Sequence, residues 1–164
     1  MNLEYIKTLI ESALHDLLNH DSMILNLKLK EECINHRFAI YIENIFKNTS
    51  NHEFLDRLSF DIEYNKSYFD EKEIIDEHDV RLRIRPDILI HERTTQHLNI
   101  LAIEAKIGYP NKKDNRTINA LLRYPFNYEY SCLVSYLPNQ VYFRVKILQR
   151  NQPLTPSFKI YKEG

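Results

Sequence analysis

Apolar side chains recur at every third or fourth position in two stretches near the start of the chain, residues 3 to 19 and residues 30 to 47. This spacing places them on one face of a helix, so the pattern predicts two amphipathic helices. The apolar positions are Leu3, Ile6, Leu9, Ile10, Ala13, Leu14 and Leu17 in the first and Ile34, Phe38, Tyr41, Ile42 and Ile45 in the second. The first stretch also carries Glu4, Glu11 and Asp16, which excludes a secretory or membrane-spanning segment there.

Further along, the period shortens to two residues. Residues 60 to 66 alternate apolar and polar side chains, as a half-buried strand does, and solvent exposure is the simplest account of the polar set Asp61, Glu63 and Asn65. Four more apolar stretches also predict strands: roughly residues 80–92, 98–106, 131–137 and 141–148. Between the second and third of these, residues 111 to 124 have the spacing of another helix.

The segment from residue 67 to residue 79 is acidic and has no clear period, so we expect a loop or a short exposed helix there. The predicted order is then helix, helix, three strands, helix and two strands, which indicates an α+β fold (mixed α/β). At 164 residues the chain is long enough to bury a core of its own as one domain. Cys33 and Cys132 belong to no CxxC or Cys/His spacing, which argues against a zinc site or disulfides and favours a cytoplasmic location.

The stretch RPDILIHERTTQHLNILAIEAK carries charge inside two predicted buried strands. If the hairpin loop is centred between Thr95 and Gln96, Asp87 lies opposite Glu104, and Lys106 points to the same face. Two facing carboxylates repel unless a cation neutralises them, and Mg²⁺ prefers oxygen ligands of this kind. A nearby lysine can contact a phosphate oxygen or the attacking water in metal-assisted phosphodiester hydrolysis. The alternative is that Lys106 simply pairs with Glu104 or Asp87 at a sheet edge.

The net charge of −1 gives no overall basic field, so a nucleic acid would have to be held by a local patch. Arg81, Arg83 and Arg85 alternate with apolar residues and, if Pro86 introduces no bulge, line the face that carries Asp87. The following helix extends this patch with Lys112, Lys113, Arg116 and Arg123. The alternative is an edge strand whose charges deter aggregation. The seven histidines have no metal-hydrolase spacing, and there is no Gly-rich phosphate loop.

Pro86-Asp87 followed by Glu104-Ala105-Lys106 resembles the PD-(D/E)xK nuclease superfamily. The resemblance implies a restriction-endonuclease-like core, a central mixed sheet flanked by helices, over about residues 31–148. Residues 1–30 would form a helical extension of the same single domain, which spans residues 1–164. The segments EECINHRFAIYIE, DIEYNK, RPDILIH and NILAIEAK, in this order, look like a group of small bacterial proteins within the superfamily.

What the superfamily implies for the site is that Asp87 and Glu104 hold the metal, with help from the Ala105 carbonyl, while Lys106 assists catalysis. The cofactor would be Mg²⁺, with Mn²⁺ able to substitute. The pattern often includes a glutamate from the first core helix, and Glu31 fits because it falls on the apolar stripe of that helix. Its alternative role is a helix N-terminal acid favoured by the dipole. Other carboxylates that remain open for this place are Glu32, Glu43 and Glu63.

We therefore expect a Mg²⁺-dependent nuclease that acts on nucleic acid, with DNA the favoured substrate, and no membrane partner. Two alternatives remain open. One is an inactive domain of the same fold that binds nucleic acid or a protein, and the other is an unrelated α+β interaction protein whose acid pair is accidental. A chain this small, without a separate recognition domain, also fits a homodimer or a partner protein that supplies specificity.

Overall fold

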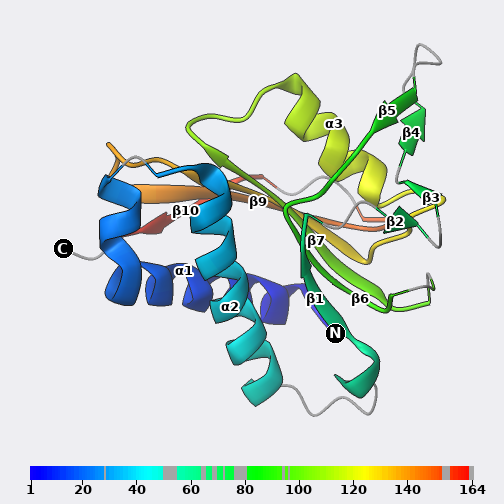
Figure 1. The fold of residues 1–164 in the computed structure, drawn as a ribbon, viewed down its shortest axis with the longest axis horizontal. Coiled ribbons are helices and arrows are strands. Elements are labelled where there is room, and N and C mark those ends of the chain that lie inside the picture. The colour runs from blue at the N-terminus through cyan, green and yellow to red at the C-terminus, as the bar shows by residue number, and fades with distance from the viewer. Residues whose placement is uncertain are drawn as a thin grey trace.

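Figure 1 shows the computed structural model of the chain, in which a central sheet lies between helices. The structure describes residues 1–27, 29–49, 55–63, 66–67, 70–71, 73–75, 81–93, 95, 97–152 and 156–162. For residues 55, 66–67, 70–71, 73–75 and 81–83 the backbone alone is described. Among the described helices, none combines the length and the apolar character that a membrane crossing requires.

Both predicted N-terminal helices are confirmed, as α1 (Leu3–Asn26) and α2 (Glu31–Thr49). The side chain of Asn2 caps α1 by accepting a hydrogen bond from the backbone N–H of Tyr5 at 2.8 Å. The helix runs beyond its predicted end, through a kink at Asp21 where φ is −131°. The Asp21 carboxylate accepts hydrogen bonds from Arg37 and Tyr41 of α2, both at 2.6 Å. This contact joins the two helices at the kink.

The main sheet has the strand order β1-β6-β7-β8-β9-β10. β7 and β8 are parallel and are joined through α3 (Lys112–Leu121), while every other neighbouring pair in this sheet is antiparallel. The prediction of an α+β fold with a mixed sheet is confirmed, whereas β10 was not predicted. The strands are β1 (Ser59–Ile62), β6 (Ile88–His91), β7 (Asn99–Ile107), β8 (Tyr130–Tyr136), β9 (Tyr142–Gln149) and β10 (Phe158–Tyr161).

The register of the β6–β7 hairpin is the predicted one. Ile88 pairs with Ile103 and Leu89 pairs with Ala102, and the register shifts only between Ile90 and His91. Continued by one residue, it places Asp87, which directly precedes β6, opposite Glu104 of β7.

Helices cover both faces of the sheet (Figure 1). On one face, Ile103 and Ala105 of β7 pack into the core that α1 and α2 form. On the other face, Ala102 packs with Leu121 of α3. Because side chains alternate along a strand, Glu104 and Lys106 point to the α3 face. The predicted site therefore lies on the side of the sheet that α3 covers.

The predicted strand over residues 80–92 is wrong, because two strands of different sheets share this stretch. β5 (Arg81–Arg83) pairs with β4 (Glu73–Ile75) in a separate two-stranded sheet, and β6 begins only at Ile88. Pro86 lies between them, and a proline cannot donate a ladder hydrogen bond. The loop or helix expected over residues 67–79 is also wrong for the described residues, which form β4 and the pair β2 (Lys66–Ser67) and β3 (Asp70–Glu71).

The face of β1 that was expected to meet solvent is partly buried. Asp61 is only 9% exposed, and its carboxylate contacts His91 at 2.9 Å and the Arg93 guanidinium. β1 ends at Ile62, where Glu63 turns the chain with a positive φ of 52°. The remaining polar residue of the predicted strand, Asn65, lies outside the described residues.

Candidate functional site

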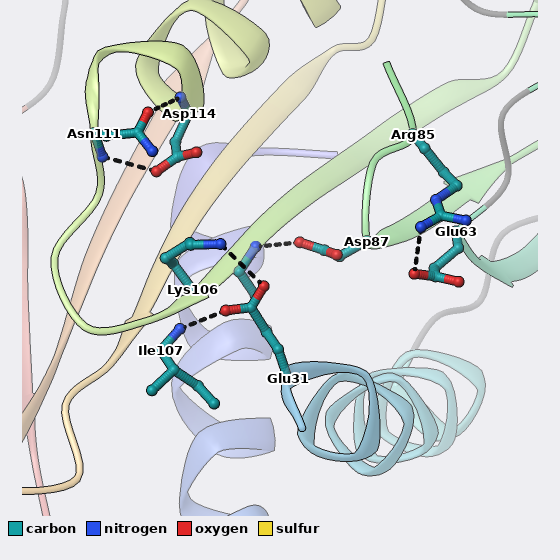
Figure 2. Close-up of polar contacts among 9 residues, drawn as sticks. Glu31, Glu63, Arg85, Asp87, Lys106, Ile107, Asn111 and Asp114 are labelled. Carbon is teal, nitrogen blue, oxygen red and sulfur yellow. Dashed lines mark hydrogen bonds and ion pairs between the residues drawn. The ribbon is translucent and has the colours of Figure 1, made fainter. Parts of the chain in front are cut away.

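Asp87 is fixed at the start of β6 by bonds to two neighbouring segments. Its backbone carbonyl accepts a hydrogen bond from the Glu63 N–H at 3.0 Å, and its Oδ2 accepts one from the Ala105 N–H at 2.7 Å (Figure 2). Burial raises the pKa of Asp87 to about 6 against the effect of the Ala105 N–H, and the carboxylates of Glu31 and Glu63 add to the rise. The site thus holds this carboxyl in place while disfavouring its charge.

Glu104 is the second carboxylate of the predicted pair. Burial raises its pKa to about 8, and the neighbouring charges of Asp87 and Asp114 push it in the same direction. Within the described part of the chain, no lysine, arginine or histidine nitrogen forms an ion pair with Asp87 or Glu104. Asp87, directly before β6, and Glu104 of β7 therefore converge, and none of the described residues supplies either with a paired cation.

Lys106 pairs with Glu31 rather than with either of these acids. Its Nζ lies 3.3 Å from Oε1 of Glu31, whose Oε2 accepts a hydrogen bond from the Ile107 N–H at 2.7 Å (Figure 2). Burial lowers the pKa of Lys106, but the Glu31 carboxylate outweighs burial and holds that pKa above its usual value. The ammonium is therefore charged at neutral pH and cannot accept a proton from water.

The position of Glu31 is explained by the start of α2. As its first residue, Glu31 benefits from the helix dipole and also reaches the end of β7, so both roles considered for it are compatible with the geometry. Of the other helical candidates, Glu32 is exposed and Glu43 pairs with Lys47 at 2.6 Å. Glu31 is thus the acid of this helix that joins the group around Lys106.

The predicted basic row is not assembled as expected. Arg81 and Arg83 belong to β5, outside the main sheet, and their side chains lie outside the described residues. Arg85 is described, and it pairs with Glu63 at 3.1 Å beside Asp87 (Figure 2). The single continuous strand on which the predicted row was based is therefore absent, because β5 and β6 belong to different sheets. The predicted helical cations Lys112, Lys113, Arg116 and Arg123 are all exposed on or just after α3.

Two residues that the sequence analysis missed contribute to the site. Asp114 is 5% exposed and forms a capping box with Asn111, in which each side chain accepts from the other residue's backbone N–H. The Asn-Lys-Lys-Asp spacing carries this signal in the sequence. Tyr136 is fully buried near Asp87 and Glu31, and burial followed by these two charges raises its pKa well above 10. No sequence pattern predicts that Tyr136 lies near these acids, because its position depends on the packing of α2 against β8.

The donor set fits a hard divalent cation. Asp87 and Glu104 offer carboxylate oxygens, and Mg²⁺ commonly takes one or two carboxylates and completes its octahedron with water and phosphate. Among the described residues, no group of three or more His, Cys, Asp or Glu side chains is placed to hold a metal ion. A metal at this position would therefore depend on water and substrate for most of its shell.

No protein family, curated protein or solved structure matches the chain. The resemblance to the PD-(D/E)xK superfamily accordingly rests on the residues Pro86-Asp87 and Glu104-Ala105-Lys106 and stays a prediction.

Proposed function

We propose that this protein is a Mg²⁺-dependent nuclease of the PD-(D/E)xK type that hydrolyses phosphodiester bonds, with DNA as the favoured substrate. The observation that carries the proposal is the convergence of Asp87 and Glu104 from neighbouring strands, without a paired cation, next to the ammonium of Lys106. A divalent cation held by the two carboxylates would polarise the phosphate and activate a water molecule. Mn²⁺ would substitute for Mg²⁺ because it accepts the same oxygen ligands.

The residues around this pair have separable roles in the proposal. The Ala105 N–H orients Asp87, and the Ala105 carbonyl is a further candidate ligand. Lys106 stays charged, so it stabilises negative charge that develops on the phosphate oxygens and orients the attacking water. Glu31 positions Lys106 by its contact at 3.3 Å.

The raised pKa values of Asp87 and Glu104 lower the stability of the fold at neutral and alkaline pH, which supports a functional role for this pair. Half-buried carboxylates with raised pKa values, such as Asp87 and Glu104, lower the stability of a protein as the pH rises, because the folded state resists their ionisation. Groups perturbed in this way by burial and by specific neighbours cluster at functional sites. Structural pairing of Lys106 with Glu104 or Asp87 would have relieved the cost, but Lys106 contacts Glu31.

Cleavage assays with matched variants test the proposal. The substrates are single-stranded DNA, duplex DNA, RNA and branched DNA, each with Mg²⁺ or Mn²⁺. We expect Lys106→Ala to retain Mn²⁺ binding but to lose cleavage by about 100-fold or more, since its contribution is made at the transition state. Asp87→Ala should lose both. Lys47→Ala removes a lysine from the last turn of α2, where it pairs with Glu43, and should behave as wild type.

Three outcomes would count against the proposal. Equal cleavage by wild type, Asp87→Ala, Glu104→Gln and Lys106→Ala would identify a contaminating nuclease. Wild type that cleaves nothing but binds nucleic acid would favour the inactive binding module. Absence of both activities would favour an unrelated α+β protein with an accidental acid pair.

A further inference from the structure

A cavity of about 650 Å³ opens beside the acid pair, over β8 and β9. Its volume falls within the roughly 300–1,000 Å³ that small-molecule sites occupy. The wall combines two cations, three small polar side chains and one aromatic ring with apolar residues: the cations are Arg144 and Lys146, the polar side chains Asn115, Ser135 and Ser157, and the ring Tyr109. The cavity therefore places two positive charges on a partly apolar wall, whereas the neighbouring site is acidic.

The two cations of the cavity have neutral partners. Arg144 Nε donates to the Ser157 hydroxyl at 3.1 Å, and Lys146 Nζ donates to the Asn115 side-chain carbonyl at 3.3 Å. Neither forms an ion pair with a carboxylate among the residues that the structure describes. These bonds orient the two positive charges without neutralising them, which suits an anionic ligand.

Strand register connects this cavity to the candidate catalytic residues. Ser135 of β8 pairs with Lys106 on one side and with Arg144 on the other. A second row of the same face runs from Glu104 through β8 to Lys146. Neighbouring strands are about 4.8 Å apart, so the cations of β9 lie roughly 10 Å across the sheet from β7. A ligand that crosses the sheet surface can reach both places.

We propose that the cavity binds one unpaired nucleotide of the substrate strand, with its phosphate between Arg144 and Lys146 and its base against Tyr109. This inference rests on the proposed function, and it specifies the substrate as nucleic acid with a single-stranded or extruded nucleotide next to the cleaved bond. Tyr109 is 61% exposed at the cavity wall, so its ring is accessible to a base. Cationic grooves with exposed aromatic rings are the common means of binding single strands.

The shape of the cavity favours an unpaired strand over a duplex. A base in a duplex has to be unstacked and unpaired, at a cost in free energy, before it can enter a pocket, whereas an unpaired base does not bear the full cost. The Asn115 side chain is already engaged by Asn111 and Lys146, and Ser135 is buried, so neither is placed to read the edge of a particular base. We therefore expect a preference for single strands with little sequence selectivity.

The test is a binding titration of the full chain in EDTA, which prevents cleavage. The probes are a fluorescein-labelled single-stranded oligodeoxynucleotide and a hairpin duplex of equal length, each measured at several salt concentrations. Arg144→Ala and Lys146→Ala should each weaken single-strand binding about tenfold and reduce the slope of log K against log salt by about 0.7. Tyr109→Ala should weaken single-strand binding about tenfold at an unchanged slope, because stacking releases no counterions.

Two controls keep the result interpretable. Lys47→Ala removes one cation from the last turn of α2, away from β8 and β9, and should change neither the affinity nor the slope. Arg144→Lys keeps the charge and should keep the slope, which separates a binding defect from a folding defect. Unchanged single-strand affinity and slope in both Arg144→Ala and Lys146→Ala would overturn the inference, as would equal losses on single strand and duplex.

Failure of this inference can be told from failure of the proposed function. If the protein cleaves DNA and Arg144→Ala and Lys146→Ala leave KM for single strands unchanged, the cavity is not the substrate site although the nuclease assignment stands. If the protein cleaves nothing, but the single strand binds and the variants weaken it as expected, the cavity assignment stands without the nuclease.

Discussion

Carboxylates at two places on the same face of one sheet differ in whether a cation contacts them. Asp61 of β1 is neighboured by His91 and Arg93, which both contact its carboxylate. Asp87, directly before β6, and Glu104 of β7 have no paired cation within the described residues. Asp61 is buried and the other two acids are half-buried, so all three have lost part of their contact with water.

The partners reverse the effect of burial on ionisation. Burial acts to raise the pKa of Asp61, but hydrogen bonds from Arg93 and His91 outweigh it and lower that pKa well below its usual value. At Asp87 and Glu104 burial prevails, and the pKa values rise to about 6 and about 8. A half-buried carboxylate without a paired cation resists ionisation, whereas one with paired cations is ionised readily, and the first arrangement is the one that our proposal assigns to a metal ion.

Removing the satisfied acid should have the largest effect on stability. Asp61→Asn leaves His91 and Arg93 without their anion, and we expect a loss of about 2 kcal/mol near neutral pH, reduced from the value for fully buried pairs because Arg93 is 57% exposed. Because the pKa of Asp61 is lowered by folding, its contribution is present above about pH 4 and is lost in acid. Urea denaturation at several pH values measures the difference, and equal stability of both proteins at pH 7 would contradict it.

Replacing Glu104, which has no paired cation among the described residues, should raise stability at alkaline pH rather than lower it. The pKa of Glu104 is raised to about 8 by folding, so metal-free wild type loses stability as the pH rises from about 4.5 to 8. Glu104→Gln has no such loss, and we expect its free energy of unfolding to exceed that of wild type by on the order of 1–2 kcal/mol at pH 8. At pH 5 we expect the variant to be no more stable than wild type.

Thermal denaturation in EDTA at the two pH values tests this expectation for Glu104. Glu43→Gln, at an ion pair on the opposite helical layer, is the matched control and should show no comparable dependence on pH. A Glu104→Gln variant that is less stable than wild type at pH 8 would show that this carboxylate contributes to the fold.

The smallest effect is expected at Glu31, which links α2 to Lys106. Glu31→Gln removes the charge that raises the pKa of Lys106, so this pKa should fall, while stability changes by less than about 1 kcal/mol because both side chains are partly exposed. Glu32→Gln, one residue away and exposed, should leave Lys106 unaffected. Titration of the lysine side chain by NMR gives the readout, and an unchanged pKa in Glu31→Gln would remove Glu31 from the group.

Much of the scaffold follows from local patterns. Helical spacing located α1 and α2, and the polar turn around Thr95 set the β6–β7 register that places Asp87 opposite Glu104. These features depend on residues close in sequence, so their signal survives without tertiary information. The choice of Glu31 combined such a stripe with a resemblance; the structure shows its contact with Lys106, and its role in a site stays a prediction.

The remaining features depend on contacts between distant segments. The alternating pattern of β1 places Asp61 on the polar face of the strand, but it does not predict that His91 and Arg93 contact its carboxylate there. The expected continuous strand over residues 80–92 is wrong because β5 and β6, on either side of Pro86, belong to different sheets, and local alternation does not reveal that break. The cavity formed with Arg144 exists only because β9 lies beside β8 and α3 packs above them.

Calorimetry of Mn²⁺ binding at pH 8 tests most directly whether Asp87 and Glu104 form the cation site. We predict that wild type binds one Mn²⁺ weakly, that Asp87→Asn and Glu104→Gln each bind at least about tenfold more weakly, and that Asp61→Asn binds as wild type below its melting temperature. Equal binding by wild type, Asp87→Asn and Glu104→Gln would contradict the account, because the cation would then lie elsewhere.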